Sequence, residues 1–140
     1  MHKIVREESR IVIPSSLDYL RDVDEFVEEK LSQKRIHPSL VADIAISVTE
    51  VVINAVNHGN KADPDKTVSI TVQIGKEEVT VRIEDQGEGF DPQKVRNPLD
   101  EENLLREAGR GIFIVRSLMD EVKIESGQQG GTMVTMVKKF

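Results

Sequence analysis

The stretch S47-V-T-E-V-V-I-N-A-V-N-H-G-N60, residues 47–60, decides how the rest of the chain can fold. At about 100° per residue, one face of a helix through it is apolar. The apolar residues are Val41, Ile44, Ala45, Val48, Val52 and Ala55. The opposite face carries a carboxylate, two carboxamides and an imidazole, from Glu50, Asn54, Asn57 and His58. Such a polar row is either an ordinary solvated helix face or a functional site, and this stretch alone favours neither.

Length and composition indicate one soluble domain, residues 1–140, with a single core. Apolar residues make up 38% and charged residues 31%, which is too mixed a composition for disorder. The formal net charge of −6 argues against nucleic-acid binding through phosphate neutralisation. The chain has no cysteine, which excludes disulfides, thiolate catalysis and cysteine-based zinc sites.

The N-terminus and the apolar segments bear on where the protein works. Residues 1–10, MHKIVREESR, are charged and lack the apolar core of a signal peptide. No apolar run in the sequence approaches the roughly 20 residues that span a bilayer. We therefore expect a cytoplasmic protein with no direct membrane or nucleic-acid partner.

The first half of the chain predicts a strand followed by two helices. The best strand segment of residues 3–13 is Ile11 to Ile13, and apolar spacing then predicts a helix over residues 17–33, capped by Ser15 or Ser16. The central helix is expected to open at residues 37–39. It is expected to end at residues 58–60, where Gly59 suits a left-handed conformation.

The second half predicts two hairpins separated by a long loop and a helix. Alternation predicts strands over residues 68–74 and 79–83. Residues 85–108 lose all periodicity, and loops this long are usually functional or disordered. A third helix follows Gly109-Arg110-Gly111, and two further strands are expected over residues 122–126 and 132–137. This order predicts an α+β fold, a two-layer sandwich whose mixed, largely antiparallel sheet carries its helices on one face.

Glycine-rich segments add a second group of candidate residues. Gly109, Arg110 and Gly111 precede a helix, where free backbone N–H groups and the positive helix end suit a phosphate. Gly87 and Gly89 follow the acidic end of a strand. Each glycine is equally well explained as an ordinary turn residue, and Arg110 as a surface cation. Only their combination with the polar helix face favours a binding site.

Three polar side chains suit nucleotide chemistry. Asn54 offers a neutral oxygen to a magnesium ion that phosphates already hold. Glu50, one turn earlier, can orient or deprotonate an attacking hydroxyl or water. Asp85, at the end of an apolar strand, can accept a hydrogen bond from the exocyclic amine of a base, or it can be a turn residue before glycine.

Four segments resemble the motifs of the GHKL ATPases, which include gyrase, heat-shock chaperone, mismatch-repair and histidine-kinase ATP sites. Residues 50–59, EVVINAVNHG, resemble the N box, and residues 84–92, EDQGEGFDP, resemble the first glycine box. Residues 109–122, GRGIFIVRSLMDEV, resemble the second glycine box, and Gly131-Thr132 the final threonine element. The amino-acid sequence of the second glycine box is most similar to that of the anti-sigma-factor serine kinases of bacteria. The P-loop pattern is absent.

The resemblance implies a Bergerat-type ATP-binding fold and a role for each matching residue. Asn54 would coordinate Mg²⁺ and Glu50 would be the general base. Asp85 would bind the adenine amino group with the help of Thr132. The remaining ATP contacts would come from Gly87 and Gly89 at the base and from Gly109, Arg110 and Gly111 at the phosphates. These last three would close an ATP lid over about residues 91–109. Asn57 stands where histidine kinases often carry a lysine, and His58 or Arg110 would replace part of that phosphate contact.

The activity implied is transfer of the γ-phosphoryl of MgATP to a serine or threonine of an anti-anti-sigma protein, combined with sequestration of a sigma factor. A homodimer is compatible with the resemblance. One alternative is a non-catalytic module that binds partners in response to ATP. A detached histidine-kinase ATP domain is less favoured, because the chain offers no room for a phospho-accepting helix pair.

Overall fold

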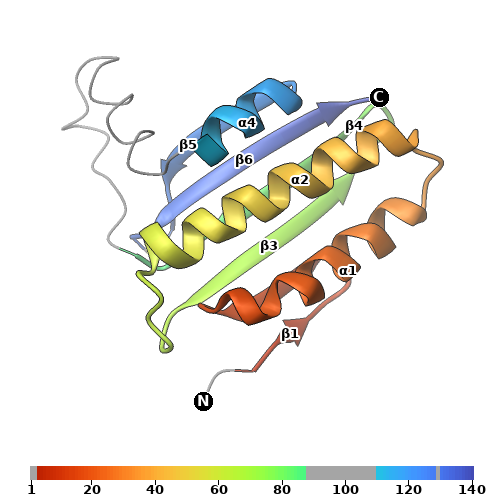
Figure 1. The fold of residues 1–140 in the computed structure, drawn as a ribbon. Helices are drawn as coiled ribbons and strands as arrows, with labels where there is room; N and C mark the ends of the chain where they lie inside the picture. Colours follow the sequence, from red (N-terminus) through yellow and green to blue (C-terminus); the bar gives the residue numbers. More distant parts are fainter. Residues whose placement is uncertain (1–2, 88–109, 129) are drawn as a thin grey trace.

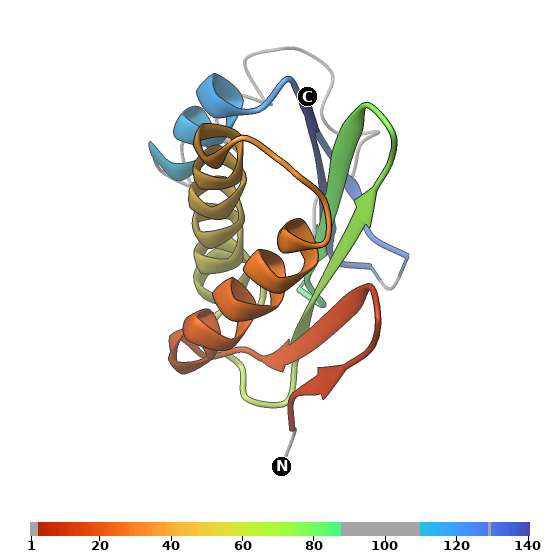
Figure 2. The ribbon, with the colours of Figure 1, turned by 90° about the vertical axis from the view of Figure 1, so that its right-hand side faces the viewer.

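A computed structural model describes residues 3–87, 110–128 and 130–140 of the chain. Its six strands form one sheet in the order β1-β2-β3-β4-β6-β5. The strands are β1 Val5–Arg6, β2 Arg10–Pro14, β3 Thr67–Ile74, β4 Glu78–Glu84, β5 Glu121–Ser126 and β6 Thr132–Lys139. Every pairing between these described strands is antiparallel. Figure 2 shows the helices on one face of this sheet, so the two-layer α+β sandwich is confirmed.

The helical layer consists of α1 Leu20–Ser32, α2 Pro38–Asn54 and α4 Arg110–Leu118. A 3-10 turn, Leu17–Tyr19 (η1), precedes α1, and a π-helical turn, Ala55–Gly59 (η2), extends α2. Figure 1 shows α2 between α1 and α4, running across the sheet. The long central helix therefore contacts both of its neighbours and sets the position of α4.

Helix starts follow the expected capping chemistry. Ser16 accepts a hydrogen bond from the Asp18 N–H at 3.2 Å. At α2, His37 accepts from the Ser39 N–H at 3.1 Å, and Pro38 occupies the first turn, where its missing donor costs nothing.

The opening segment differs from the single strand predicted over residues 3–13. It forms a hairpin instead, in which the two-residue β1 pairs Val5 with Val12 and Arg6 with Ile11. The Glu7 N–H closes the turn by donating to the Arg10 carbonyl at 2.7 Å. The turn residues Glu7, Glu8 and Ser9 are exposed, because a hydrophilic run is more stable in a solvated turn than in an unbroken strand on the core.

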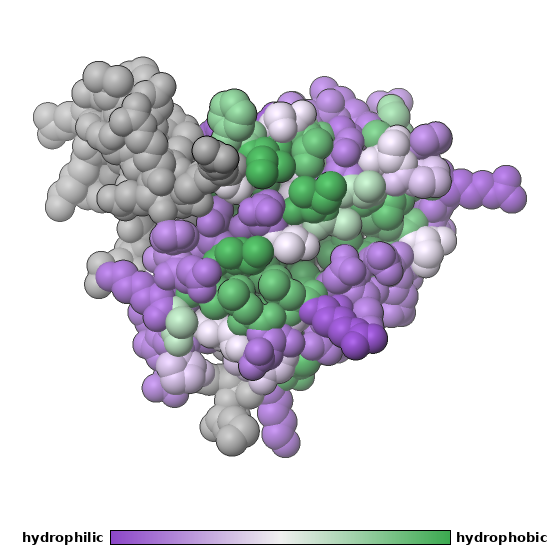
Figure 3. All heavy atoms as spheres, in the orientation of Figure 1, coloured by the Kyte–Doolittle hydropathy of each residue, from purple (hydrophilic) through white to green (hydrophobic). Residues whose placement is uncertain are grey.

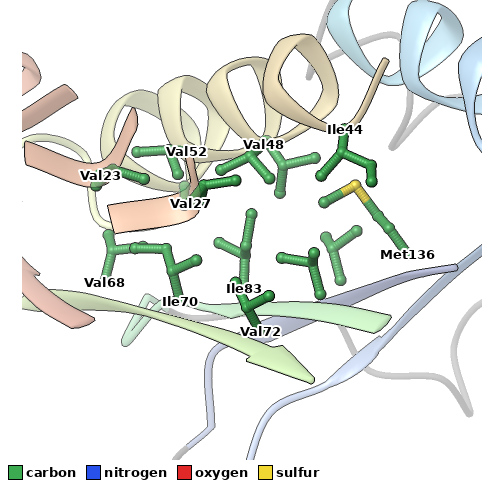
Figure 4. Packing of buried hydrophobic residues seen from close by; sticks show 14 of the residues in the cluster. Val23, Val27, Ile44, Val48, Val52, Val68, Ile70, Val72, Ile83 and Met136 are labelled. Atoms are coloured by element: carbon green, nitrogen blue, oxygen red, sulfur yellow. The ribbon is translucent and has the colours of Figure 1, made fainter. Parts of the chain in front are cut away.

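Aliphatic side chains fill most of the space between the two layers, and Phe26 is the largest fully buried side chain of the described residues. Figure 4 shows the helical and sheet contributions facing one another: Val23 and Val27 of α1, Ile44, Val48 and Val52 of α2, and Val68, Ile70, Val72, Ile83 and Met136 of the sheet. All are buried. The apolar face predicted for the central helix therefore lies on the core.

The segment Pro38–Gly59 corrects the expectation that no apolar run approaches membrane-spanning length. The segment has 22 residues, and an 18-residue window within it has a mean hydropathy of 1.7, enough to cross a bilayer by length and composition alone. In the structure this segment contributes Ile44, Val48 and Val52 to the core beneath it. Burial within the protein accounts for its apolar composition.

The end of the central helix also differs from the prediction. The Asn60 N–H donates to the Ala55 carbonyl at 2.8 Å, the five-residue spacing of a π turn. The left-handed residues are Lys61 and Ala62, with φ of 52° and 55°, and Gly59 is not among them. The wider turn carries the chain past Gly59 before the chain reverses direction. Gly59 is needed for its close approach to Asp85 and not for a left-handed conformation.

Lys138 on β6 joins both neighbouring helices to the sheet. Its Nζ lies 3.1 Å from Asp43 Oδ2 on α2 and donates to the Leu118 carbonyl at the end of α4. The Lys138 side chain is 13% exposed, so both contacts are shielded from water. A cation at this position also complements the negative end of the α4 dipole.

Replacing Lys138 with Met should lower the free energy of unfolding by about 2 kcal/mol, because a charge-assisted hydrogen bond and an ion pair are lost together. Lys139→Met is the matched control, since that side chain is exposed; it should change stability by less than about 0.5 kcal/mol. Urea unfolding measures both. Equal effects of the two variants would contradict the bridging role of Lys138.

Candidate functional site

Asp85 lies directly after β4 and is 5% exposed. Its Oδ1 accepts hydrogen bonds from the Gly87 N–H at 2.9 Å and the Thr132 N–H at 3.1 Å. The Asp85 N–H in turn donates to the Thr132 carbonyl at 3.0 Å. The structure thus brings Asp85, Gly87 and Thr132 together. Within the described residues, Asp85 Oδ2 accepts no hydrogen bond, which leaves one oxygen for a donor from outside the protein.

Three glycines allow the backbone to converge on this carboxylate. A Cβ at Gly59 would lie 2.2 Å from Asp85 Oδ2, and one at Gly131 would lie 2.0 Å from the Asp85 carbonyl oxygen. A Cβ at Gly87 would lie 1.9 Å from the Gly59 carbonyl oxygen. No side chain fits at these separations, so these glycines are required by close approach. The sequence pattern included Gly59 and Gly131, but it did not indicate their contact with Asp85.

Burial is the main influence on the Asp85 carboxyl. It raises the pKa above the usual value of 3.8, because desolvation disfavours the charged form. The hydrogen bonds from Gly87 and Thr132 act in the opposite direction, and the nearby Glu84 charge adds to the increase. The outcome is a fixed, largely desolvated acceptor, suited to a specific N–H donor.

Glu50 and Asn54 form a second group at the seam between α2 and α4. A Cβ at Gly111 would lie 2.7 Å from Glu50 Oε2 and 3.2 Å from Asn54 Nδ2. Gly111 therefore lets the start of α4 sit directly on both side chains. The structure brings these three predicted residues together, with the N-terminal end of a nine-residue helix beside them.

The carboxamide of Asn54 carries a buried nitrogen with no hydrogen-bond partner in the described structure. Such an atom is costly, and the oxygen and nitrogen of a carboxamide are distinguished only by their hydrogen bonds. An external hydrogen-bond acceptor, such as a phosphate oxygen, would relieve the cost at the nitrogen, whereas a cation could bind only at the carboxamide oxygen. The side chain fits a hard cation that binds through oxygen, such as Mg²⁺.

The remaining predicted residues are not placed in either group. Asn57 and His58 are exposed on η2, so the polar row expected on one helix face divides after Asn54, where the π turn changes the helical phase. Gly89, Gly109 and the lid predicted over residues 91–109 lie outside the described residues. The description of the chain resumes at Arg110, where α4 begins. Nothing is described of the Arg110 side chain.

Asn60 belongs to the site, and sequence analysis missed it. It is 1% exposed, and its Oδ1 accepts from the Gln86 N–H at 2.8 Å. Its Nδ2 donates to Ser15 Oγ at 2.7 Å and to the Thr67 carbonyl at 2.9 Å. The only signal in the sequence is a polar residue directly after the apparent end of the helix, which is also typical of an ordinary turn.

Asp85→Asn should raise the free energy of unfolding near neutral pH, because an amide avoids burying a charge and can still accept both backbone hydrogen bonds. A carboxyl whose pKa is raised by folding contributes its full stability below the unfolded value of 3.8 and loses it as the pH rises through the folded value. The advantage of the variant should therefore vanish below 3.8.

Urea unfolding across this pH range measures the effect. Asp24→Asn is the control, since Asp24 is exposed on α1 and should give no such pH-dependent difference. An Asp85→Asn protein no more stable than the parent at neutral pH would show that burial does not dominate the carboxyl.

Comparison with known proteins places the chain in a family. Residues 13–138 match the model of the histidine kinase-like ATPase domain. The serine-protein kinase RsbW of Staphylococcus epidermidis is 31% identical over 133 residues, which cover 90% of this chain and 82% of that protein. The anti-sigma F factor of Clostridium botulinum is 36% identical over 102 residues, covering 71% of each chain.

One further relative and two solved structures with a similar fold also match the chain. The RsbW of Oceanobacillus iheyensis is 34% identical, and the matched region covers 70% of this chain and 65% of that protein. The solved RsbU and RsbW domains of a Mycobacterium tuberculosis protein superpose with a TM-score of 0.61 at 22% identity, over 92% of this chain and 32% of that one. The mycobacterial sensor histidine kinase MprB gives 0.57 at 20%, over 96% and 97%. The chain belongs to the histidine kinase-like ATPase family, in the group of anti-sigma-factor serine kinases that includes RsbW and the anti-sigma F factor.

Proposed function

We propose that the protein transfers the γ-phosphoryl of MgATP to a serine or threonine of an anti-anti-sigma protein and sequesters a sigma factor. The observation that carries the proposal is the placement of Glu50 one turn from Asn54, with the start of α4 against both. A carboxylate beside a candidate metal ligand and a helix N-terminus has the components that phosphoryl transfer needs: a proton acceptor and stabilisation of charge.

Asp85 would recognise the base. Its free Oδ2 accepts a hydrogen bond from the exocyclic amine of adenine, while the Gly87 and Thr132 N–H groups hold Oδ1 in place. The absence of a side chain at Gly59 allows its backbone to pack against Asp85 without displacing the carboxylate. Gly89, which follows in the same motif, would complete the base pocket.

Asn54 would hold the metal through its carboxamide oxygen. A bound Mg²⁺ neutralises phosphate charge and orients the reacting phosphoryl group. The N-terminal N–H groups of α4, including that of Gly111, would bind phosphate oxygens, with Gly109 and Arg110 completing this end. Asn57 and His58, exposed on η2 at the end of the same helix, would contact the nucleotide from solvent.

Glu50 would act on the acceptor protein. Its carboxylate accepts the proton of the serine hydroxyl as that oxygen forms its bond to phosphorus, and the bond to the departing ADP oxygen breaks. Nothing in this step requires a phospho-accepting histidine. The protein would act in the cytoplasm, where sigma factors work, as a monomer or as a homodimer.

Glu50→Gln should lower phosphate transfer to the acceptor protein by at least about 100-fold while ATP affinity changes less than about threefold, since a general base contributes 10²–10⁴-fold to rate. Labelled ATP and a purified anti-anti-sigma partner measure transfer, with phosphoserine identified by mass spectrometry. Glu28→Gln on the exposed side of α1 is the matched control. Label on histidine, or ATP binding with no transfer by the parent protein, would overturn the kinase proposal; the second result would favour an ATP-responsive binding module.

Asn54→Ala should abolish most of the Mg²⁺ dependence of nucleotide binding. With the oxygen ligand lost, ATP affinity in the presence of Mg²⁺ should fall by about tenfold or more, a typical cost for an oxygen contact to a charged group. Affinity in the presence of EDTA should change little. Calorimetry with and without Mg²⁺ distinguishes this result from general damage, which would weaken binding under both conditions.

A further inference from the structure

Asn60 connects four separate parts of the fold through one buried carboxamide. Besides its contacts to Gln86, Ser15 and Thr67, the Ser15 hydroxyl it binds donates to the Lys66 carbonyl at 2.7 Å. The Gln86 side chain accepts from the Thr67 N–H at 2.8 Å, which closes the network. The ends of α2 and β2, the start of β3 and the end of β4 thus meet at Asn60.

Two residues connect Asn60 with Asp85: Gly59, which precedes Asn60 in the chain, and Gln86, which follows Asp85. Gly59, directly before Asn60, packs so closely against Asp85 that a Cβ there would lie 2.2 Å from Oδ2. Gln86, whose backbone N–H binds Asn60 Oδ1, directly follows Asp85. One side chain therefore fixes both the backbone that carries the carboxylate and the backbone that faces its free oxygen.

The other contacts of Asp85 constrain this spacing only in part, because close packing against Gly59 sets a lower limit on the distance and no upper limit. The Gly87 and Thr132 N–H groups hold Oδ1 relative to β4 and β6, within the sheet. Among the described hydrogen bonds of Asp85 and Gln86, the one that the Gln86 N–H donates to Asn60 Oδ1 joins them to the end of the central helix. Without it, Gly59 and Asp85 could separate by a few tenths of an ångström, which is enough to spoil a hydrogen bond at Oδ2.

We propose that Asn60 is a positioning residue for purine recognition, which fixes Asp85 relative to Gly59 so that Oδ2 is held in place for an exocyclic amine. This role rests on the proposed function, in which Asp85 binds adenine. Asn60 does not touch the base; it acts through Gly59, its chain neighbour, and through Gln86, whose N–H donates to its Oδ1. Its loss should therefore reduce selectivity for the amine more than it reduces binding of the nucleotide as a whole.

The test compares ATP with purine riboside triphosphate, which has the same ring and phosphates without the exocyclic amine. The parent protein should prefer ATP by about tenfold or more, as expected for a hydrogen bond to a charged group. In Asn60→Ala this preference should fall below about threefold, through weaker binding of ATP with little change for the analogue. Titration calorimetry on the folded variant gives both dissociation constants.

Val27→Ala is the control for general destabilisation, because Val27 is fully buried in the core on α1 and makes none of the hydrogen bonds of this network. It should lower stability and keep the preference for ATP. If Asn60→Ala folds too poorly to titrate, Asn60→Ser, which leaves a smaller cavity, should show the same reduced preference.

The outcomes separate the two proposals. A parent protein that does not distinguish ATP from the analogue would overturn recognition of the amine by Asp85, and the role of Asn60 with it. A parent that distinguishes them, with Asn60 variants that weaken both nucleotides in parallel, would leave the proposed function standing and reduce Asn60 to a purely structural residue.

Discussion

The buried carboxylate of Asp85 is the constraint on which the rest of the structure depends. A carboxylate removed from water is costly unless hydrogen bonds replace its hydration. Here two backbone N–H groups do so at Oδ1, one from the segment after β4 and one from the start of β6. Both can approach only because Gly87 and Gly131 lack side chains. The position of one charged group therefore determines where three segments must converge.

The long central helix carries this constraint to the other end of the site. Gly59, at the end of η2, lies against Asp85, and Glu50 and Asn54 lie nine and five residues earlier on the same continuous helix. At 1.5 Å per residue, Glu50 and Gly59 are separated by about 13 Å along the axis. The core residues of α2 hold the helix on the sheet, and Lys138 ties it to α4. The packing of α2 thus sets the distance between Asp85 at one end of the site and Glu50 and Asn54 at the other.

The helical face also exposes several apolar side chains. Ile46 on α2 and Phe113 and Ile114 on α4 are exposed, and Figure 3 shows apolar surface interrupting the polar surface on this side of the molecule. Isolated exposed apolar residues are common in soluble proteins.

Much of the fold could be predicted because local patterns and tertiary structure agree. The alternation over residues 68–74 and 79–83 and the helical spacing around Val48 and Val52 all match observed elements. Predictions failed where a distant contact decides the backbone. The π turn, the left-handed Lys61 and Ala62, and the burial of Asn60 serve contacts with Ser15, Thr67 and Gln86, and a local pattern carries no information about these.

The candidate site shows the same division between local and distant causes. Glu50 and Asn54 stand out in sequence because polar residues follow an apolar helix pattern, whereas the importance of Gly59 depends on a residue 26 positions later. The two ends of the site also differ in what they can reveal about function. The proposed recognition of a base at Asp85 would serve any member of the family that binds adenine, and the relatives and structural neighbours include proteins named as serine kinases and as a histidine kinase. Since a fold does not determine the acceptor, phosphorylation of serine would depend on Glu50 and on which acceptor group can reach Glu50 beside α4.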